Sequence, residues 1–279
     1  MSGLVVVRVA GLATVQDRGR PGRMHEGVPV GGALVPELLA RANAAVDNAW
    51  DEAAIEVLGS IAVAAAGPLF VGNDAGDVCV LSDGETWSVD CQGARVRYLA
   101  VRGGIDVPRV LGGRGTLLSA GLGGHEGRPL RRGDSLAAGS GPPVQTEAPL
   151  TLDPLAPLRV VPGPDLDRVG PDVLERLVSS QLTVDPRSDR AGVRLAGPPL
   201  GRPLADTGVS APMVRGAIQL PPDGVPIVLG PDHPTTGGYP VIGTVVRADH
   251  GRLAALRVGA RVRLVAVGGQ FSAAATPGR

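Results

Sequence analysis

A loop near residue 235 carries the densest set of groups in this chain that could bind or activate a small molecule. It reads Asp232-His-Pro-Thr-Thr-Gly-Gly-Tyr-Pro240. Asp232 or His233 could act as an acid or base, Tyr239 adds a phenol, and the glycine amides can approach a ligand closely. We predict Asp232, His233 and Tyr239 as catalytic residues, although a turn with Tyr239 as core filler is the alternative. The substrate contacts predicted from the same loop are Thr235, Thr236, Gly237 and Gly238.

A second candidate site lies in Val214-Arg-Gly-Ala-Ile-Gln219, which has the alternation of a β strand. Alternate side chains share one face of a strand, so Arg215 and Gln219 would project together, with Ala217 between them. Polar side chains are costly to bury without partners, and this pair could hold a planar amide or a carboxylate. We predict that Arg215 and Gln219 bind the substrate.

A third polar segment is Thr14-Val-Gln-Asp-Arg-Gly-Arg-Pro-Gly22. Arg18 or Arg20 could hold a carboxylate or phosphate as a bidentate fork. An Asp–Arg pair that locks the turn explains the same residues equally well. We predict a secondary binding loop formed by Gln16, Asp17 and Arg20.

The chain contains no lysine, so arginine supplies all of its strongly basic side chains. This excludes a lysine-linked biotin on this chain, a lysine Schiff base, a P-loop lysine and a Ser-Ser-Lys amidase mechanism. No G-x-S-x-G, HExxH or Walker A motif occurs, and the four histidines lack metal-ligand spacing. We predict no metal site.

The composition predicts a mainly β fold that positions these segments. The 279 residues include 42 Gly and 26 Pro, while 43% are hydrophobic, enough to bury a sizeable core. Glycine and proline in this number fit many tight turns between short strands, as in a sandwich or barrel. Helical periodicity marks residues 36–49 and 171–180. Strands are predicted at 4–9, 78–81, 95–101, 227–229, 244–247 and 261–267.

A proline-rich stretch after residue 139 predicts a linker between two halves. The predicted division is an N-terminal β half with one helix at 1–140, a linker at 141–157 and a C-terminal β half at 158–279. Acidic and basic residues balance at 27 each, which argues against nucleic-acid or membrane partners. No leader or membrane-length apolar run is recognisable, so we expect a cytoplasmic protein.

These segments belong to a longer series of motifs along nearly the whole chain. In order, they include Thr14-Val-Gln-Asp17, Gly27-Val-Pro29, Ala42-Asn43, Tyr98-Leu-Ala-Val-Arg-Gly-Gly-Ile-Asp-Val-Pro108, Ser188-Asp-Arg190, Gly216-Ala-Ile-Gln219, Pro221-Pro-Asp-Gly224 and Thr235-Thr-Gly-Gly-Tyr-Pro240. Their number and order resemble the biotin-dependent carboxyltransferase family. That family includes the C-type subunit of 5-oxoprolinase, often labelled the second subunit of allophanate hydrolase.

The resemblance implies a mainly β fold with two cyclophilin-like, barrel-type halves and a few short helices. It also implies a component of a 5-oxoprolinase-type complex, which opens 5-oxoproline to glutamate with ATP. The implied partners are a B-type sister subunit from the same family and an A-type subunit that resembles lactam hydrolases. ATP would act through the complex, and this chain would not be active alone. Through its motif, Arg190 joins the predicted substrate-binding residues.

Two other roles in this family stay open. One is the carboxyltransferase of a urea amidolyase or allophanate-type system, with biotin on another chain. The other is a non-enzymic regulator of its sister subunit, as in the kinase-inhibitor antagonist branch. Departures from the family pattern leave the exact substrate open: Val241 replaces the usual lysine, Val35 the usual aspartate, and Gly113 and Gly115 two serines.

Overall fold

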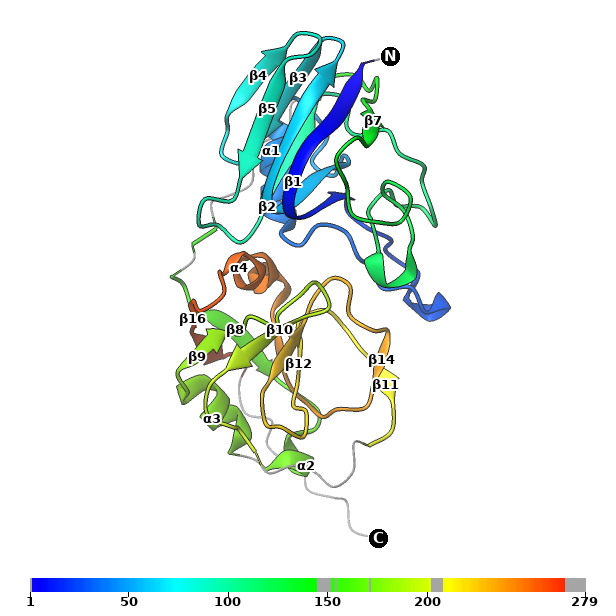
Figure 1. Ribbon diagram of the computed structural model, residues 1–279. Coiled ribbons are helices and arrows are strands. Elements are labelled where there is room, and N and C mark those ends of the chain that lie inside the picture. The colour runs from blue at the N-terminus through cyan, green and yellow to red at the C-terminus, as the bar shows by residue number, and fades with distance from the viewer. Residues whose placement is uncertain (1, 145–151, 154, 171, 202–207, 269–279) are drawn as a thin grey trace.

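Two β sheets, one from the N-terminal and one from the C-terminal part of the chain, make up most of the molecule (Figure 1). The computed structural model describes residues 2–144, 152–153, 155–170, 172–201 and 208–268. Within these ranges, no helix is long and apolar enough to cross a bilayer. The fold is mainly β with a few short helices, which confirms the predicted fold class.

The first sheet has seven strands in the order β4-β3-β6-β2-β1-β7, with β5 paired to β2. The strands are β1 (Gly3–Gln16), β2 (Ala54–Ala66), β3 (Leu69–Asn73), β4 (Val78–Leu81), β5 (Thr86–Asp90), β6 (Arg97–Val101) and β7 (Ser135–Ala137). Alternate side chains of β1 and β2, among them Val15, Ile55 and Val57, are fully buried in a core beneath this sheet.

A glycine pair lets the long strands β1 and β2 approach closely near their midpoints. Gly11 lies opposite Gly59, and both have positive φ, +93° and +124°. A Cβ atom on Gly11 would lie 2.3 Å from a carbonyl oxygen of the other strand, and one on Gly59 2.1 Å. Glycine is therefore required at both positions. Beyond this crossing, β2 carries Glu56 at the end of the sheet that meets the second half.

The second sheet has eight strands, which curve into a nearly closed barrel (Figure 1). Its order is β16-β9-β10-β13-β12-β15-β8-β17. The strands are β8 (Leu158–Pro162), β9 (Leu182–Val184), β10 (Gly192–Ala196), β12 (Ala217–Gln219), β13 (Ile227–Leu229), β15 (Val241–Val245), β16 (Arg261–Val262) and β17 (Leu264–Ala266). A separate small ribbon pairs β11 (Ala211–Pro212) with β14 (Thr236–Gly237).

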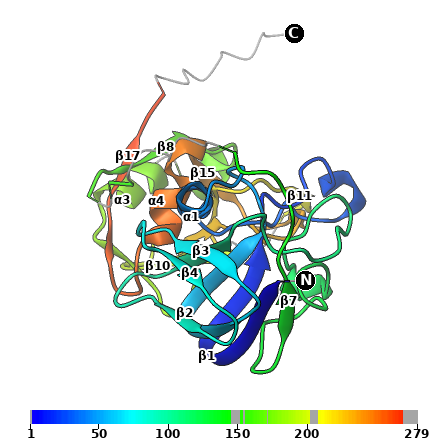
Figure 2. The same cartoon turned by 90° about the horizontal axis from the view of Figure 1, so that it is seen from above.

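Two helices meet between the sheets: α1 (Pro36–Ala45) and α4 (His250–Ala255) lie close together in Figure 2. They share an apolar cluster in which Leu39 and Ala42 of α1 and Tyr98 of β6 pack with Ala254 of α4. Two other helices, α2 (Leu166–Val169) and α3 (Val173–Ser179), belong to the second half, and Val173 and Leu177 of α3 enter its core. The α1–α4 contact brings polar residues of both halves together.

The sequence located α1, α3 and the strands β1, β4, β6, β13, β15, β16 and β17, missed β3, β5 and β7 to β10, and misplaced several ends. The helix predicted at 36–49 ends at Ala45, because the chain leaves the helical conformation at Val46 and turns at Asp47 with φ +56°. The predicted strand at 4–9 runs on to Gln16, and β2 had no predicted counterpart. Residues 145–151 and 154 of the predicted linker lie outside the described residues, and the domain boundaries stay a prediction.

Candidate active site between the two halves

A pocket of about 870 Å³ lies where the two halves meet. Its N-terminal walls come from the loop after β1, from α1 and from the turn after α1. Its C-terminal wall comes from the segment before β12 and from the start of α4. Side chains important for its chemistry are Arg18, Glu37, Trp50, Arg215, Arg247 and His250.

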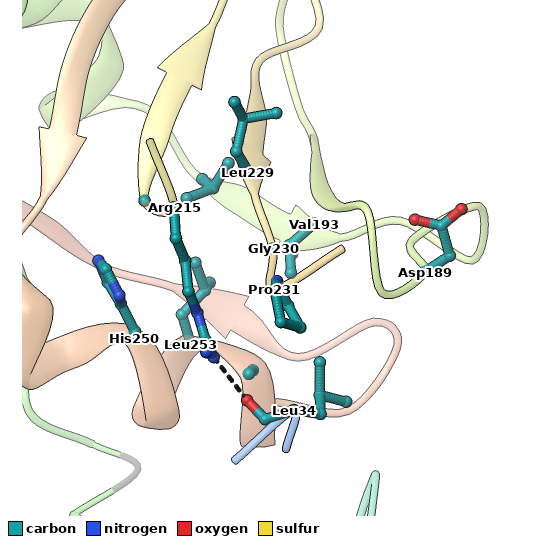
Figure 3. A pocket seen from close by; sticks show the side chains of 12 residues that line it. Leu34, Asp189, Val193, Arg215, Leu229, Gly230, Pro231, His250 and Leu253 are labelled. Atoms are coloured by element: carbon teal, nitrogen blue, oxygen red, sulfur yellow. Dashed lines mark hydrogen bonds between the residues drawn. The ribbon is translucent and has the colours of Figure 1, made fainter. Parts of the chain in front are cut away.

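Arg215 has guanidinium donors to spare for a ligand in this pocket. It is partly buried, and Figure 3, which draws a smaller pocket that Arg215 also lines, shows its guanidinium directed at the Leu34 backbone, where Nη2 donates to the carbonyl oxygen at 2.8 Å. In the described part of the chain, no carboxylate lies within salt-bridge distance of Arg215. Burial and the nearby Arg190 lower the pKa of Arg215, but a guanidinium stays protonated at neutral pH. The charge is thus held in place without a counter-ion in contact.

His250 stands beside Arg215 (Figure 3), and its hydrogen bond defines its tautomer. Its Nε2 lies 2.9 Å from the Val245 carbonyl oxygen, which only accepts, so Nε2 must carry the proton. Burial lowers the pKa of His250, and the charges of Arg215 and Arg247 lower it further. The imidazole is therefore neutral at pH 7, with Nδ1 as an acceptor.

Arg190 is committed to a buried cluster that joins the halves. Its guanidinium pairs with Glu56 of β2, donates to the Gly32 carbonyl oxygen at 2.5 Å, and forms two hydrogen bonds to Asp232, of 2.8 and 3.0 Å. The side chains of Arg190 and Asp232 are each 6% exposed. Burial opposes the charge of Arg190, but Glu56 and Asp232 outweigh it and raise the pKa. The donors and acceptors predicted to meet substrate here instead satisfy one another.

Tyr98 and Leu34 extend this cluster toward the pocket. The Tyr98 hydroxyl donates to Glu56 Oε2 at 2.6 Å and accepts from the Val35 amide at 3.0 Å. Burial and the Glu56 charge raise the pKa of Tyr98 well above its usual value. The Leu34 amide also donates to Glu56 Oε2, at 2.7 Å, while its carbonyl holds Arg215. One peptide segment thus connects the ion-pair cluster to Arg215.

The predicted catalytic loop separates into buried and exposed parts. His233 is buried, and its Nδ1 donates to the Pro234 carbonyl oxygen at 2.8 Å. Burial lowers the pKa of His233, with a smaller contribution from Arg215. Tyr239 is 39% exposed rather than core filler. Thr236 and Gly237 form strand β14, and the Thr235 carbonyl accepts from the Met213 amide.

The strand alternation that was predicted to pair Arg215 with Gln219 does not hold. Strand β12 begins at Ala217, after Gly216 with φ +88°, and its pairing with β15 shifts between Ile218 and Gln219. Gln219 is buried, and its Nε2 contacts the Met213 sulfur at 3.3 Å. Arg215 instead enters the pocket between the halves, so the two side chains have different surroundings.

Gln16, Asp17 and Arg20 hold their own loop together. Asp17 accepts from the backbone amides of Gly19, Arg114 and Gly115, at 2.6–3.0 Å. Gln16 and Arg20 donate to backbone carbonyls of the segment 110–116. One Arg20 nitrogen, Nη1, is buried with no partner among the described residues. The loop is thus fixed by hydrogen bonds to backbone groups, and the Asp–Arg pair of the alternative interpretation does not occur among the described residues.

The sequence did not point to the residues that complete the site, namely Glu37, Glu56, Tyr98, Arg247 and His250. Glu56 did carry a signal, because it is a lone carboxylate within the apolar run 53–58, where a buried charge requires a partner. The others have no such local signal. Glu37 meets Arg247 and His250 where α1 packs against α4, whereas Glu56 and Tyr98 come from strands β2 and β6.

Comparison with known proteins places the chain in a family. A family model described as "Carboxyltransferase domain, subdomain A and B" matches residues 26–266, and the chain belongs to this carboxyltransferase domain family. It is 35% identical to the C-type subunit of 5-oxoprolinase from Escherichia coli (strain K12), over 94% of this chain and 90% of that protein. These findings confirm the resemblance seen in the sequence motifs.

Two solved structures share the fold over 95% of this chain. The structure of TTHA0988 has a TM-score of 0.82 at 27% identity, and this chain covers 55% of it. The K. lactis urea amidolyase has a TM-score of 0.84 at 25% identity, and this chain covers 19% of it. The chain therefore spans about half of the first protein and about a fifth of the second.

Proposed function

We propose that this chain is the C-type subunit of a 5-oxoprolinase complex, which opens 5-oxoproline to glutamate with ATP. The observation that carries the proposal is the guanidinium of Arg215, held by Leu34 in a large pocket and without a carboxylate partner among the described residues. The family relationship supports the choice of complex. The proposed partners are a B-type sister subunit from the same family and an A-type, lactam-hydrolase-like subunit; ATP would act through the complex.

The spare donors of Arg215 fit the carboxylate or lactam oxygen of 5-oxoproline, because a guanidinium binds planar oxygen groups through two parallel hydrogen bonds. Val30 and Pro36 offer an apolar surface in the same pocket, and neutral His250 adds no second charge. We propose that Arg190 and Asp232 support this site by fixing the Gly32–Leu34 segment. The contacts predicted for His233, Gln219 and the 235–239 loop stay proposals.

The test is reconstitution of the complex from this chain and its B-type and A-type partners. We expect ATP cleavage that depends on 5-oxoproline, and its loss in Arg215→Ala. Arg215→Gln keeps hydrogen-bond donors without the charge and should retain a small part of the activity. Arg8→Ala, at an exposed position of β1 outside the pocket, is the control, and the complex that contains it should cleave ATP at the wild-type rate. Unchanged coupled turnover in Arg215→Ala would remove this residue from the site.

A second candidate is the carboxyltransferase of a urea-type system, favoured by the TM-score of 0.84 to the K. lactis urea amidolyase. Biotin would then be carried by another chain, because this chain has no lysine. Urea-dependent turnover with a carboxybiotin-bearing partner, and none with 5-oxoproline, would decide for it. Tight binding to the sister subunit without turnover of either substrate would instead favour a non-enzymic regulator.

A further inference from the structure

Glu37 is a pocket carboxylate with an unsatisfied oxygen. It occupies the first turn of α1, directly after Pro36, and the preceding Val35 provides no side-chain cap. A carboxylate is favoured there, because the first amides of a helix carry partial positive charge. Oε2 of Glu37 is nevertheless buried without any hydrogen-bond partner among the described residues. A buried acceptor without a donor is costly, and such a group calls for an explanation.

Close packing against α4 fixes the position of this carboxylate. A Cβ atom on Gly251 would lie 2.0 Å from Glu37 Oε2 and 2.6 Å from its Cδ. Only glycine therefore allows the carboxylate to rest against α4. The neighbouring Arg252 is not available to neutralise it, since that guanidinium pairs with Asp249 at 2.6 Å.

Arg215 and Glu37 are complementary groups that do not pair. Both line the same pocket, and the charge of Glu37 acts on Arg215 from a distance, but the two are not within salt-bridge distance. Arg215 has donors without an acceptor, and Glu37 has an acceptor without a donor among the described residues. A ligand that presents an oxygen acceptor and an N–H donor on one small rigid frame would satisfy both.

We propose that Glu37 accepts the N–H of the bound substrate through Oε1, because Oε2 is buried against α4, while Arg215 donates to the substrate oxygen. The pocket thereby selects lactams and ureides over esters and lactones, which have the oxygen but no N–H. This inference rests on the proposed function and adds the residue that distinguishes an amide from its oxygen analogue. A site that hydrogen-bonds an N–H rejects the analogue without it, because its buried acceptor is then left unpaired.

The test compares 5-oxoproline with its lactone analogue, 5-oxotetrahydrofuran-2-carboxylate, by calorimetric titration of the assembled complex without ATP. We expect wild type to bind the lactam at least tenfold more tightly than the lactone. Glu37→Met should abolish this preference, whereas Glu37→Gln, which keeps an acceptor, should retain part of it. Glu175→Met, at an exposed position of α3, is the matched control and should behave as wild type.

Gly251→Ala gives a second test that leaves the carboxylate in the chain. Its Cβ would displace Glu37, so the lactam preference should fall as it does in Glu37→Met. A lactam preference preserved in both variants, with normal 5-oxoproline turnover in wild type, would overturn the role of Glu37 alone. If wild type bound neither compound, the proposed function would fail together with this inference.

Discussion

Arg190 and Glu56 form a buried ion pair between the two halves of the molecule. Glu56 lies on β2, and its side chain is 0% exposed. Arg190 lies in the segment before β10, and its side chain is 6% exposed. Glu56 also accepts from the Leu34 amide and the Tyr98 hydroxyl. Each of these groups donates a hydrogen bond to the Glu56 carboxylate. These bonds compensate for the water that the buried charge loses on folding.

Loss of the shared guanidinium should destabilise the protein strongly. Arg190→Met leaves the Glu56 and Asp232 carboxylates buried without their cation, and the expected loss is about 3–5 kcal/mol; Glu56→Gln should cost less, because Asp232 still pairs with Arg190. Urea unfolding followed by circular dichroism measures it. Arg176→Met removes an exposed pair with Asp172 and should cost less than about 1 kcal/mol. Equal effects in the buried and exposed variants would contradict a structural role for the pair.

Removal of the Tyr98 hydroxyl should also destabilise the fold, by about 1–3 kcal/mol. Tyr98→Phe deprives Glu56 of a donor and leaves the Val35 amide without its acceptor. The control is Tyr239→Phe, because Tyr239 is 39% exposed and no hydrogen bond of its hydroxyl occurs among the described residues. The same denaturation measurement applies, and the two variants should differ clearly.

The fold class followed from sequence because it depends on local signals. Glycine and proline at short intervals predicted tight turns, and β6, β13 and α1 stood out by their own periodicity. Strand β2 was missed because Ala54, Ile55, Glu56 and Val57 are all buried, so no alternation of apolar and polar residues marks it. Strand β2 is long because it pairs with β1 along nearly its whole length, and a local sequence pattern does not reveal this pairing.

Arg215 was predicted from sequence to bind the substrate, but for a reason that the structure does not support. Strand alternation suggested a partnership with Gln219, whereas the turn at Gly216 sends Arg215 toward Leu34. Arg215 shares its pocket with Glu37 and His250, and Glu37 is distant in sequence. They are brought together by the α1–α4 contact, and no spacing rule in one sequence predicts such a contact.

Asp249 should give the protein an acid-sensitive contribution to stability. Burial alone would raise its pKa, but hydrogen bonds from Arg159 and Arg252 outweigh this and hold the pKa at about 2, below the usual 3.8. A depressed carboxyl pKa adds stability above pH 4 that is lost as the pH falls through 2, here about 2 kcal/mol. Urea unfolding between pH 2 and pH 6 should show a shallower pH dependence in Asp249→Asn than in wild type. The same pH dependence in both proteins would contradict this role of Asp249.

Trp50 should report occupancy of the pocket. It is 47% exposed at the pocket wall, and the turn that carries it is tied by Asn43 to the Trp50 carbonyl and by Asp51 to Arg18. A bound ligand would displace water from the indole and shift its emission to shorter wavelength. The shift caused by 5-oxoproline in the assembled complex should persist in Trp87→Phe and vanish in Trp50→Phe. The opposite pattern would place the ligand elsewhere.

Gly216 should be required for the position of His250, beyond its backbone conformation. Its φ is +88°, and a Cβ atom there would lie 2.2 Å from His250 Nε2 and 2.8 Å from the Val245 carbonyl oxygen. Gly259 is a matched control, because its φ is +79° but nothing lies within 4 Å of an added Cβ. Both Gly→Ala variants carry a similar backbone cost of about 1 kcal/mol. Only Gly216→Ala should also break the His250–Val245 hydrogen bond, lower the melting temperature further and impair turnover by the complex. Equal melting temperatures in the two variants would show that His250 tolerates displacement.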